Sequence, residues 1–416
     1  MQGGPTRPAP RLYHVKLLDL MTNWLGVEVD RSLSLKQCGM SDKRIKYRRP
    51  LDQRDLEKIG IWLRQGKWQH MPADKSGVHH CSKRQTGLPV TLTVTSKGIY
   101  IDKKSNAFLG SGGYKKVTKA VLIDNNGNIE KVAAYRFNSR DGYDKNKNAQ
   151  MILAKHNIKD PFSVTDFHTY SSSKGELRFK SYSPIIETDL KAILDRKKLS
   201  KPDAIALIEQ LILVTQQVAE WHQQGLAHRD IKPENIFFNG SHFTLGDMDG
   251  VTDSAQTERF GTFNFIQPMV SIRPKSTLDE LQASDIFALG MTFGQILDLS
   301  DLETYRNRVR SINRKPDLFI SDCAVNLLFQ VNRPKLSEMH DRRQEEMQRQ
   351  LLNAYNLLSP SGDKNSLERA LSEVCIAMLH PFQQVKACEA VVMLEKIFMN
   401  PSYPQTTKDS FKIIRQ

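Results

Sequence analysis

The chain has 416 residues, of which 39% are hydrophobic and 25% charged, and this composition excludes a largely disordered, collagen-like or coiled-coil protein. No apolar run reaches the ~18 residues of a membrane span, and residues 1–10 lack the apolar stretch of a secretory signal. The scattered cysteines do not predict a disulfide framework: Cys38, Cys81, Cys323, Cys375 and Cys388. We therefore expect a protein of a reducing compartment such as the cytosol, without a transmembrane segment.

The net charge of +14 is concentrated in residues 1–100, which hold 18 Lys/Arg and 8 Asp/Glu. Apolar spacing predicts helices over residues 12–26 and 51–68 of this basic N-terminal module. Between them lies a basic cluster of Lys43, Arg44, Lys46, Arg48 and Arg49. The cluster indicates either a polyanionic partner, such as an inositol phosphate or an anionic lipid, or merely a solvated basic face. A nucleic-acid partner is disfavoured because Tyr47 is the single aromatic residue in the run.

From residue 88 the pattern changes to the period of two that predicts strands, and a β-rich stretch continues to about residue 182. Residues 124–128 (DNNGN) predict a hairpin turn. After residue 188 the helical period dominates. The sequence thus predicts an α+β protein of three parts: the module 1–100, a β-rich lobe 101–186, and a helical lobe 187–416 with an insertion near 300–365.

The strongest motif is the run HRDIKPEN at residues 228–235, which follows a predicted helix over 204–224. Asp247-Met248-Asp249 comes twelve residues after Asn235. This order and spacing resemble the catalytic loop of the protein kinase superfamily, specifically the eukaryotic-type Ser/Thr kinases. The resemblance implies a bilobal protein-kinase-like fold with a β-rich N-lobe and a helical C-lobe.

The resemblance also implies an ATP- and Mg²⁺-dependent phosphoryl transfer to a protein substrate. Asp230 would accept or orient the proton of the substrate hydroxyl, and Lys232 would neutralise the transferring phosphoryl group. Asn235 and Asp247 would hold magnesium, because their oxygens are the hard ligands that this ion takes.

Upstream, the run LGSGGYKKV at residues 109–117 resembles the kinase Gly-rich loop. Gly110, Ser111 and Gly112 would place backbone N–H groups against phosphate, and Val117 would cap the adenine. The third glycine of the family pattern is replaced by Lys115.

The next predicted strand, residues 131–137 (KVAAYRF), departs from the V-A-x-K pattern of the family. We align Ala134 with the adenine-contacting alanine and Arg136 with the lysine. No glutamate occurs between residues 131 and 175, so Gln150 is the expected partner of Arg136. Alternatively, the cation that binds phosphate comes from Lys115, Lys116 or Lys119.

The segment after Asp247 departs from the family as well. Met248-Asp249 stands where the family has Phe-Gly, and Met269 stands where it has the glutamate that pairs with a buried arginine. Residues 379–387 contain no arginine, so both partners are lost together. Arg229 is expected to meet a charge on this segment, either phosphate on Thr252, Ser254 or Thr257, or the carboxylate of Asp253 or Glu258.

Three hypotheses follow from the intact catalytic loop and the altered accessory motifs. The chain is an active Ser/Thr protein kinase, a nucleotide-binding pseudokinase scaffold, or a kinase-fold enzyme with another transfer reaction such as adenylylation. The mixture of motifs is similar to that of effector kinases that bacteria inject into host cells, which is an analogy at the level of the fold.

Overall fold

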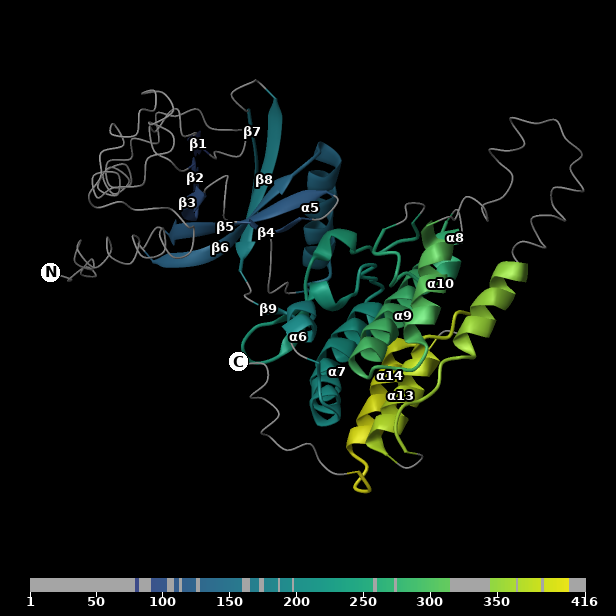
Figure 1. Cartoon of the computed structure of the whole chain (residues 1–416). Coiled ribbons are helices and arrows are strands. Elements are labelled where there is room, and N and C mark those ends of the chain that lie inside the picture. Colours follow the sequence, from purple (N-terminus) through teal and green to yellow (C-terminus); the bar gives the residue numbers. More distant parts are fainter. Residues whose placement is uncertain are drawn as a thin grey trace, which may run out of the picture. The chain divides into compact units, whose positions relative to one another are not determined.

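The structure is a computed structural model of the whole chain, and its described residues are 79–81, 91–102, 108–111, 114–124, 128–158, 165–171, 176–185, 188–196, 198–256, 260–272, 275–314, 345–363, 366–382 and 385–403. The predicted helices over 12–26 and 51–68 and the basic cluster at 43–49 lie outside these residues. The chain divides into two compact units (Figure 1). The first comprises Met1–Gln150 and Pro161–Ile185, and the second comprises Met151–Asp160 and Ile186–Gln416.

The first unit is built on one antiparallel sheet, as the alternating sequence of residues 88–182 predicts. In its described part the strands are β1 (His79–Cys81), β2 (Thr91–Thr95), β3 (Gly98–Asp102), β4 (Phe108–Ser111), β5 (Lys115–Asp124), β6 (Ile129–Phe137), β7 (Thr165–Ser171) and β8 (Leu177–Pro184). They are ordered β1-β2-β3-β5-β6-β8-β7, with β4 paired to β5. The β5–β6 hairpin has its turn where predicted, because the Asn128 N–H donates to Asp124 Oδ1 at 2.7 Å.

The two faces of this sheet have different coverings. Helix α5 (Arg140–Lys155) packs on one face, where Tyr143 meets the rings of Phe137 and Phe179 at centroid distances of 5.5 and 5.2 Å. We call this side the α5 face. Cross-strand neighbours share a face, so the α5 face includes Lys115, Val117, Lys119, Ala133, Tyr135, Phe137 and Phe179.

The opposite side of the sheet is called the Asp102 face. Tyr100 and Tyr182 stack there with ring centroids 3.8 Å apart and are almost wholly buried. Cross-strand pairing places the following residues on it: Tyr100, Asp102, Lys116, Ala134, Arg136, Lys180 and Tyr182. The sheet therefore carries an aromatic face under α5 and a mixed aromatic and ionic face behind it.

The second unit is mainly helical. Its helices are α6 (Leu190–Arg196), α7 (Lys201–Gln223), α8 (Pro268–Ile272), α9 (Leu278–Ile296), α10 (Leu302–Arg314), α13 (Leu367–Met378) and α14 (Ala387–Phe398). Residues 345–355 are also helical. Helix α9 is the core element: it begins with a Thr277–Glu280 capping box and buries side chains around its whole circumference. Helix α13 packs on α9, and α14 packs on α7 (Figure 1).

A short sheet beside these helices positions the functional residues. Its strands are β9 (Thr188–Asp189), β10 (Ile236–Phe238) and β11 (Phe243–Leu245), all antiparallel, and 3-10 turns η4 (Pro233–Asn235) and η5 (Met248–Gly250) flank the β10–β11 hairpin.

These observations confirm the predicted α+β class, with a β-rich N-terminal lobe and a helical C-terminal lobe. The sheet starts at His79, before the position 101 at which the β-rich lobe was expected to begin, since β1 to β3 pair continuously with β5. Among the helices that the structure describes, none has the length and apolarity needed to cross a membrane.

Candidate active site

The catalytic loop is held from beneath by a buried carboxylate on α9. Asp285 is 1% exposed and accepts the backbone N–H groups of His228 and Arg229, each at 2.7 Å. These charge-assisted bonds hold Arg229 in the left-handed conformation, at φ 75°. Asp285 thereby fixes the backbone immediately before Asp230.

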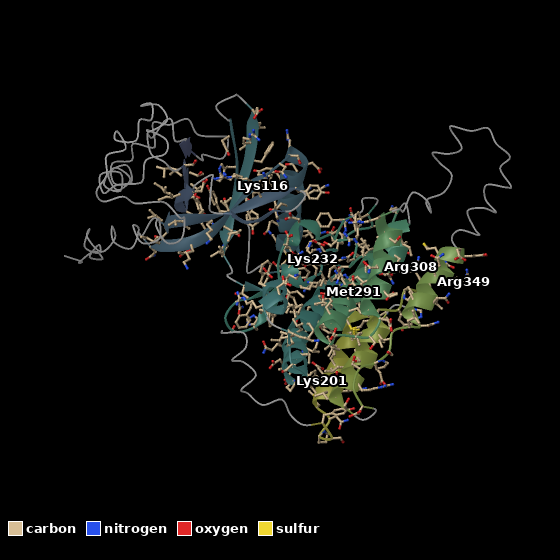
Figure 2. The ribbon with its side chains drawn as sticks, viewed as in Figure 1. Lys116, Lys201, Lys232, Met291, Arg308 and Arg349 are labelled. Carbon is tan, nitrogen blue, oxygen red and sulfur yellow. The ribbon has the colours of Figure 1, made fainter. Side chains whose placement is uncertain are left out.

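Asp230 lies at the centre of a hydrogen-bond network. The Lys232 ammonium donates to Asp230 Oδ2 at 2.7 Å and to the Thr262 hydroxyl at 2.8 Å. Thr262 in turn donates to Asp230 Oδ1 at 2.9 Å. The carboxylate is therefore held in one orientation by a cation and a hydroxyl, while its side chain keeps 10% exposure. Figure 2 labels Lys232, the cation of this network. The structure thus brings the two predicted catalytic residues, Asp230 and Lys232, into direct contact.

The predicted magnesium ligands come from the open end of the β10–β11 hairpin. The Gly246 N–H donates to Asn235 O at 2.9 Å, so Asn235 and the residue before Asp247 lie side by side. The Asn235 side-chain amide donates to Asp230 O at 2.8 Å and to Asp230 Oδ2 at 3.0 Å. Because the NH₂ group of Asn235 is used in this way, its carbonyl oxygen is the group left for a cation. Amide and carboxylate oxygens suit Mg²⁺, so this pair fits the metal that the family implies.

The activation segment approaches the catalytic loop through glycine. Gly261 has φ 114°, and a Cβ at this position would collide with the carbonyl oxygen of Arg229. A Cβ on Gly250 would lie 2.7 Å from His228 O. Gly250 thus provides a close approach to the catalytic loop one position later than the glycine of the family pattern. Met248 is 3% exposed and fills the apolar position predicted for it.

Of the groups expected to meet Arg229, the Asp253 carboxylate is bound elsewhere. Arg229 stacks on the ring of Phe260 at 5.2 Å, whereas Asp253 pairs with Lys155 of α5 at 2.6 Å. The candidate phosphorylation site Thr252 is 3% exposed. Asp253 thus contacts α5 within the second unit rather than supplying a charge to Arg229, and residues 257–259 lie outside the described part.

A neutral contact stands where the family has its buried ion pair. Gln267, two residues before Met269, is 4% exposed and donates from Nε2 to the carbonyl oxygen of Pro381 at 3.3 Å. Its backbone N–H donates to Ser284 Oγ at 3.1 Å. The end of the activation segment is therefore still tied to residues 379–387, but by an amide, which the sequence did not predict.

In the first unit, the Gly-rich strand lies where predicted. Gly110 pairs with Val117, and Ser111 pairs with Lys116, across the β4–β5 ladder. Gly112 lies outside the described residues. The side chain of Val117 is half-buried on the α5 face, beside its β6 neighbour Tyr135.

The register of β6 does not bring Ala134 and Arg136 to Val117. Ala134 is wholly buried on the Asp102 face, in a cluster with Tyr100, Val132 and Tyr182. A one-residue difference along a strand moves a side chain to the other face, so Ala133 and Tyr135 are the β6 residues beside Val117. The corrected alignment of V-A-x-K is therefore Val132-Ala133-Ala134-Tyr135, which places tyrosine at the lysine position.

Arg136 belongs instead to a buried ion cluster. Its guanidinium and the Lys180 ammonium both pair with Asp102, whose side chain has no exposure. Arg136 and α5 are on opposite faces of the sheet, so the predicted pair with Gln150 is wrong. Burial lowers the pKa of Lys180 to about 8, against the opposing effect of Asp102. Only the long-range pairing of β3, β6 and β8 creates this cluster, and no local motif indicates it.

Taken together, the second unit presents a fixed carboxylate, an ammonium group and two oxygen ligands. Within the described residues there is no cluster of three or more His, Cys, Asp or Glu side chains that would hold a transition metal. The arrangement can orient a hydroxyl, stabilise negative charge and hold a hard cation, which are the requirements of phosphoryl transfer.

The protein kinase domain family model matches residues 104–374. The chain therefore belongs to the protein kinase superfamily, as its catalytic loop predicts.

Among similar proteins, the interferon-induced, double-stranded RNA-activated protein kinase of Rattus norvegicus is 27% identical over 247 residues, covering 52% of this chain and 46% of that protein. Its Mus musculus counterpart is 25% identical over 290 residues, covering 64% and 54%. Serine/threonine-protein kinase PknD of Mycobacterium tuberculosis is 29% identical over 143 residues, covering 32% and 20%. The chain thus spans about half the length of the two rodent proteins.

Proposed function

We propose that this protein transfers the γ-phosphoryl group of ATP to a serine or threonine hydroxyl of a protein substrate. The observation that carries the proposal is the Asp230 network, in which Lys232, Thr262 and Asn235 all bind one carboxylate. Such an arrangement positions a base and neutralises charge without covalent chemistry, which is what phosphoryl transfer needs.

Each residue of the network has a role in this reaction. Asp230 accepts the hydroxyl proton, and Lys232 stabilises the charge of the transferring group. Asn235 and Asp247 would hold magnesium, which supplies charge neutralisation of the nucleotide phosphates when bound. Thr262 is bonded to both Asp230 and Lys232 and keeps these two side chains in fixed positions. The preference for Ser/Thr over Tyr is supported by the Lys232–Thr262 contact and by the names of the similar kinases.

The test is transfer of labelled γ-phosphate from MgATP to a generic basic protein, with the wild type beside Asp247→Ala. Asp249→Asn is the matched control, since it changes an acid two residues away in the same turn. Labelling that Asp247→Ala abolishes and Asp249→Asn retains would support the kinase. Labelling that is equal in all three would refute it.

The same experiment separates the alternatives. A pseudokinase scaffold would bind nucleotide and leave every substrate unlabelled. An adenylyl transferase would label the substrate from α-labelled but not from γ-labelled ATP, and mass spectrometry would distinguish an adenylyl from a phosphoryl adduct.

We further propose that a polyanion activates the protein. The support is the charge of residues 1–100, which carry 18 basic and 8 acidic side chains. Inositol hexakisphosphate should raise the thermal midpoint and the activity at low salt, and Lys46→Glu with Arg48→Glu should remove both effects. If neither quantity responds, the polyanion proposal fails while the kinase proposal stands. The role as a bacterial effector in a host cell stays a prediction from analogy.

A further inference from the structure

On the α5 face, strand β6 lacks the lysine that kinases of this pattern use to bind phosphate. Tyr135 occupies that position, and Arg136 is bound to Asp102 behind the sheet. A phosphate-binding cation on the α5 face must therefore come from another strand, if the protein binds ATP beside Val117.

Because side chains alternate along β5, the candidate lysines lie on different faces of the sheet. Lys115 and Lys119 share the α5 face with Val117, whereas Lys116 pairs with Arg136 and lies on the Asp102 face. Lys116 is exposed, and it is also the cross-strand neighbour of Ser111. It is therefore on the wrong side of the sheet to meet a nucleotide that contacts Val117.

Position along the strand distinguishes Lys115 from Lys119. Lys115 is the first residue of β5, directly after the Gly-rich turn, and Lys119 lies four residues further along. At ~3.4 Å per residue this distance is roughly 14 Å, so Lys119 lies well away from the Gly-rich strand end. Lys115 is therefore the α5-face lysine nearest to Gly110 and Ser111, which pair with Val117 and Lys116.

The Lys115 side chain is already held on this face. Lys115 is 8% exposed, and its ammonium lies 4.9 Å from the centroid of the Tyr135 ring. Tyr135 is fixed in turn, because its hydroxyl is 3.1 Å from Ser183 Oγ. The ring that replaces the family lysine thus binds the ammonium of Lys115 at the same place, by a cation–π contact.

We propose that Lys115 is the residue that binds the α- and β-phosphates of ATP, in place of the missing β6 lysine. Tyr135 preorganises its ammonium over the α5 face until the nucleotide phosphates replace the ring as its counter-charge. This assignment rests on the proposed kinase function, because it assumes that ATP binds beside Val117.

The test compares three substitutions of a cation by methionine: Lys115→Met, Lys116→Met and Arg136→Met. Phosphoryl transfer should fall by about 10²-fold in Lys115→Met, the usual effect of removing one charged donor from such a site. Lys116→Met is the matched control, adjacent in sequence and on the other face, and it should stay within about twofold of the wild type. Thermal unfolding of each apo variant checks that the fold is intact.

A rescue variant distinguishes phosphate binding from structural support. Lys115→Met combined with Tyr135→Lys returns a lysine to the β6 position of the same face. The transfer activity of this double variant should be about tenfold higher than that of Lys115→Met. A merely structural role for Lys115 would not be rescued, because the second substitution also removes the contact between the Tyr135 hydroxyl and Ser183 Oγ.

Nucleotide binding decides the assignment independently of turnover. MgATP should stabilise the wild type against heat more than adenosine does, and Lys115→Met should lose this phosphate-dependent difference. If only the kinase proposal is wrong, the wild type will transfer no phosphate. MgATP will still stabilise it against heat more than adenosine does, and Lys115→Met will still abolish that difference. Wild-type-like transfer and nucleotide stabilisation in a folded Lys115→Met protein would overturn the assignment, as would loss of both in a folded Arg136→Met protein alone. Absence of any MgATP effect on the wild type would refute both proposals.

Discussion

Asp102 in the first unit and Asp230 in the second are both carboxylates bound to cations, and they differ in how much of their charge is neutralised. Asp102 of the first unit has no exposure and is neutralised by Arg136 and Lys180. Asp230 of the second unit shares its charge with a single ammonium, and its side chain retains 10% exposure. The first cluster is closed and suited to stability, whereas the second is reachable, as the proposed transfer reaction requires. An arginine on a strand near the Gly-rich strand thus indicates a phosphate site only when its side chain is known to lie on the same face of the sheet as that site.

The largest effect should come from the open cluster. Asp230→Asn keeps an acceptor for Thr262 but removes the base, so phosphoryl transfer should fall by about 10²- to 10⁴-fold. The thermal midpoint should change little, because the Lys232 side chain is 18% exposed and its ammonium can be hydrated once the carboxylate charge is removed. Steady-state transfer and a melting curve measured on the same preparation would check both statements. A variant that lost activity only through unfolding would show that Asp230 serves structure, and the contrast with Asp102 would fail.

Asp102→Asn should have the opposite signature. It leaves Arg136 and Lys180 facing each other, with Lys180 only 1% exposed, and should destabilise the first unit by about 3–5 kcal/mol, typical of a buried pair broken on one side. Urea unfolding would measure the loss. Adding Lys180→Met removes one of the stranded charges and should recover part of it. A single-variant loss below about 1 kcal/mol would contradict the assignment of the cluster to stability.

The two clusters also differ in how far the sequence predicts them. The bonds that Lys232 and Asn235 make to Asp230 join residues two and five positions apart, so a contiguous motif encodes them, whereas the bond from Thr262 spans 32 positions. Arg136 and Asp102 are 34 positions apart, and Lys180 and Asp102 are 78 apart. These pairs depend on the strand register, in which a shift of one residue exchanges the faces of the sheet. That is why the α+β fold and the catalytic loop were predictable, while the role of Arg136 was not.

Gln267 offers an intermediate case, because it is a neutral tie between segments 114 positions apart. Gln267→Leu keeps the volume but leaves the buried carbonyl of Pro381 without this donor, at a cost of about 1–3 kcal/mol. The loss should appear as a lower thermal midpoint together with reduced transfer, since Gln267 follows Thr262 on the same segment. Gln267→Glu should be worse than leucine at neutral pH, because it would bury an unpaired charge. Equal stability of all three proteins would show that the contact contributes nothing.

The smallest effect is expected at Asp253, whose pair with Lys155 is exposed on the lysine side at 67%. Such surface pairs contribute about 0.2–1 kcal/mol, so Asp253→Asn should lower the stability by no more than this at physiological salt. The hydrogen bond from Lys155 holds the pKa of Asp253 below its usual value. A depressed carboxylate pKa contributes stability above the unfolded pKa of about 3.9, and that contribution disappears as the pH falls through the folded pKa.

The difference between wild type and Asp253→Asn should therefore shrink from pH 7 towards pH 3, and it should also shrink as salt is raised. His156 Nε2 lies 3.6 Å from the same carboxylate, so His156→Gln serves as the control that separates the two partners. If Asp253→Asn loses much of its transfer activity while its stability changes little, the pair does more than stabilise the surface. Asp253 would then position the activation segment against α5 in the way that a phosphate on this segment is expected to do, and the second unit would have a permanent charge where other kinases add one.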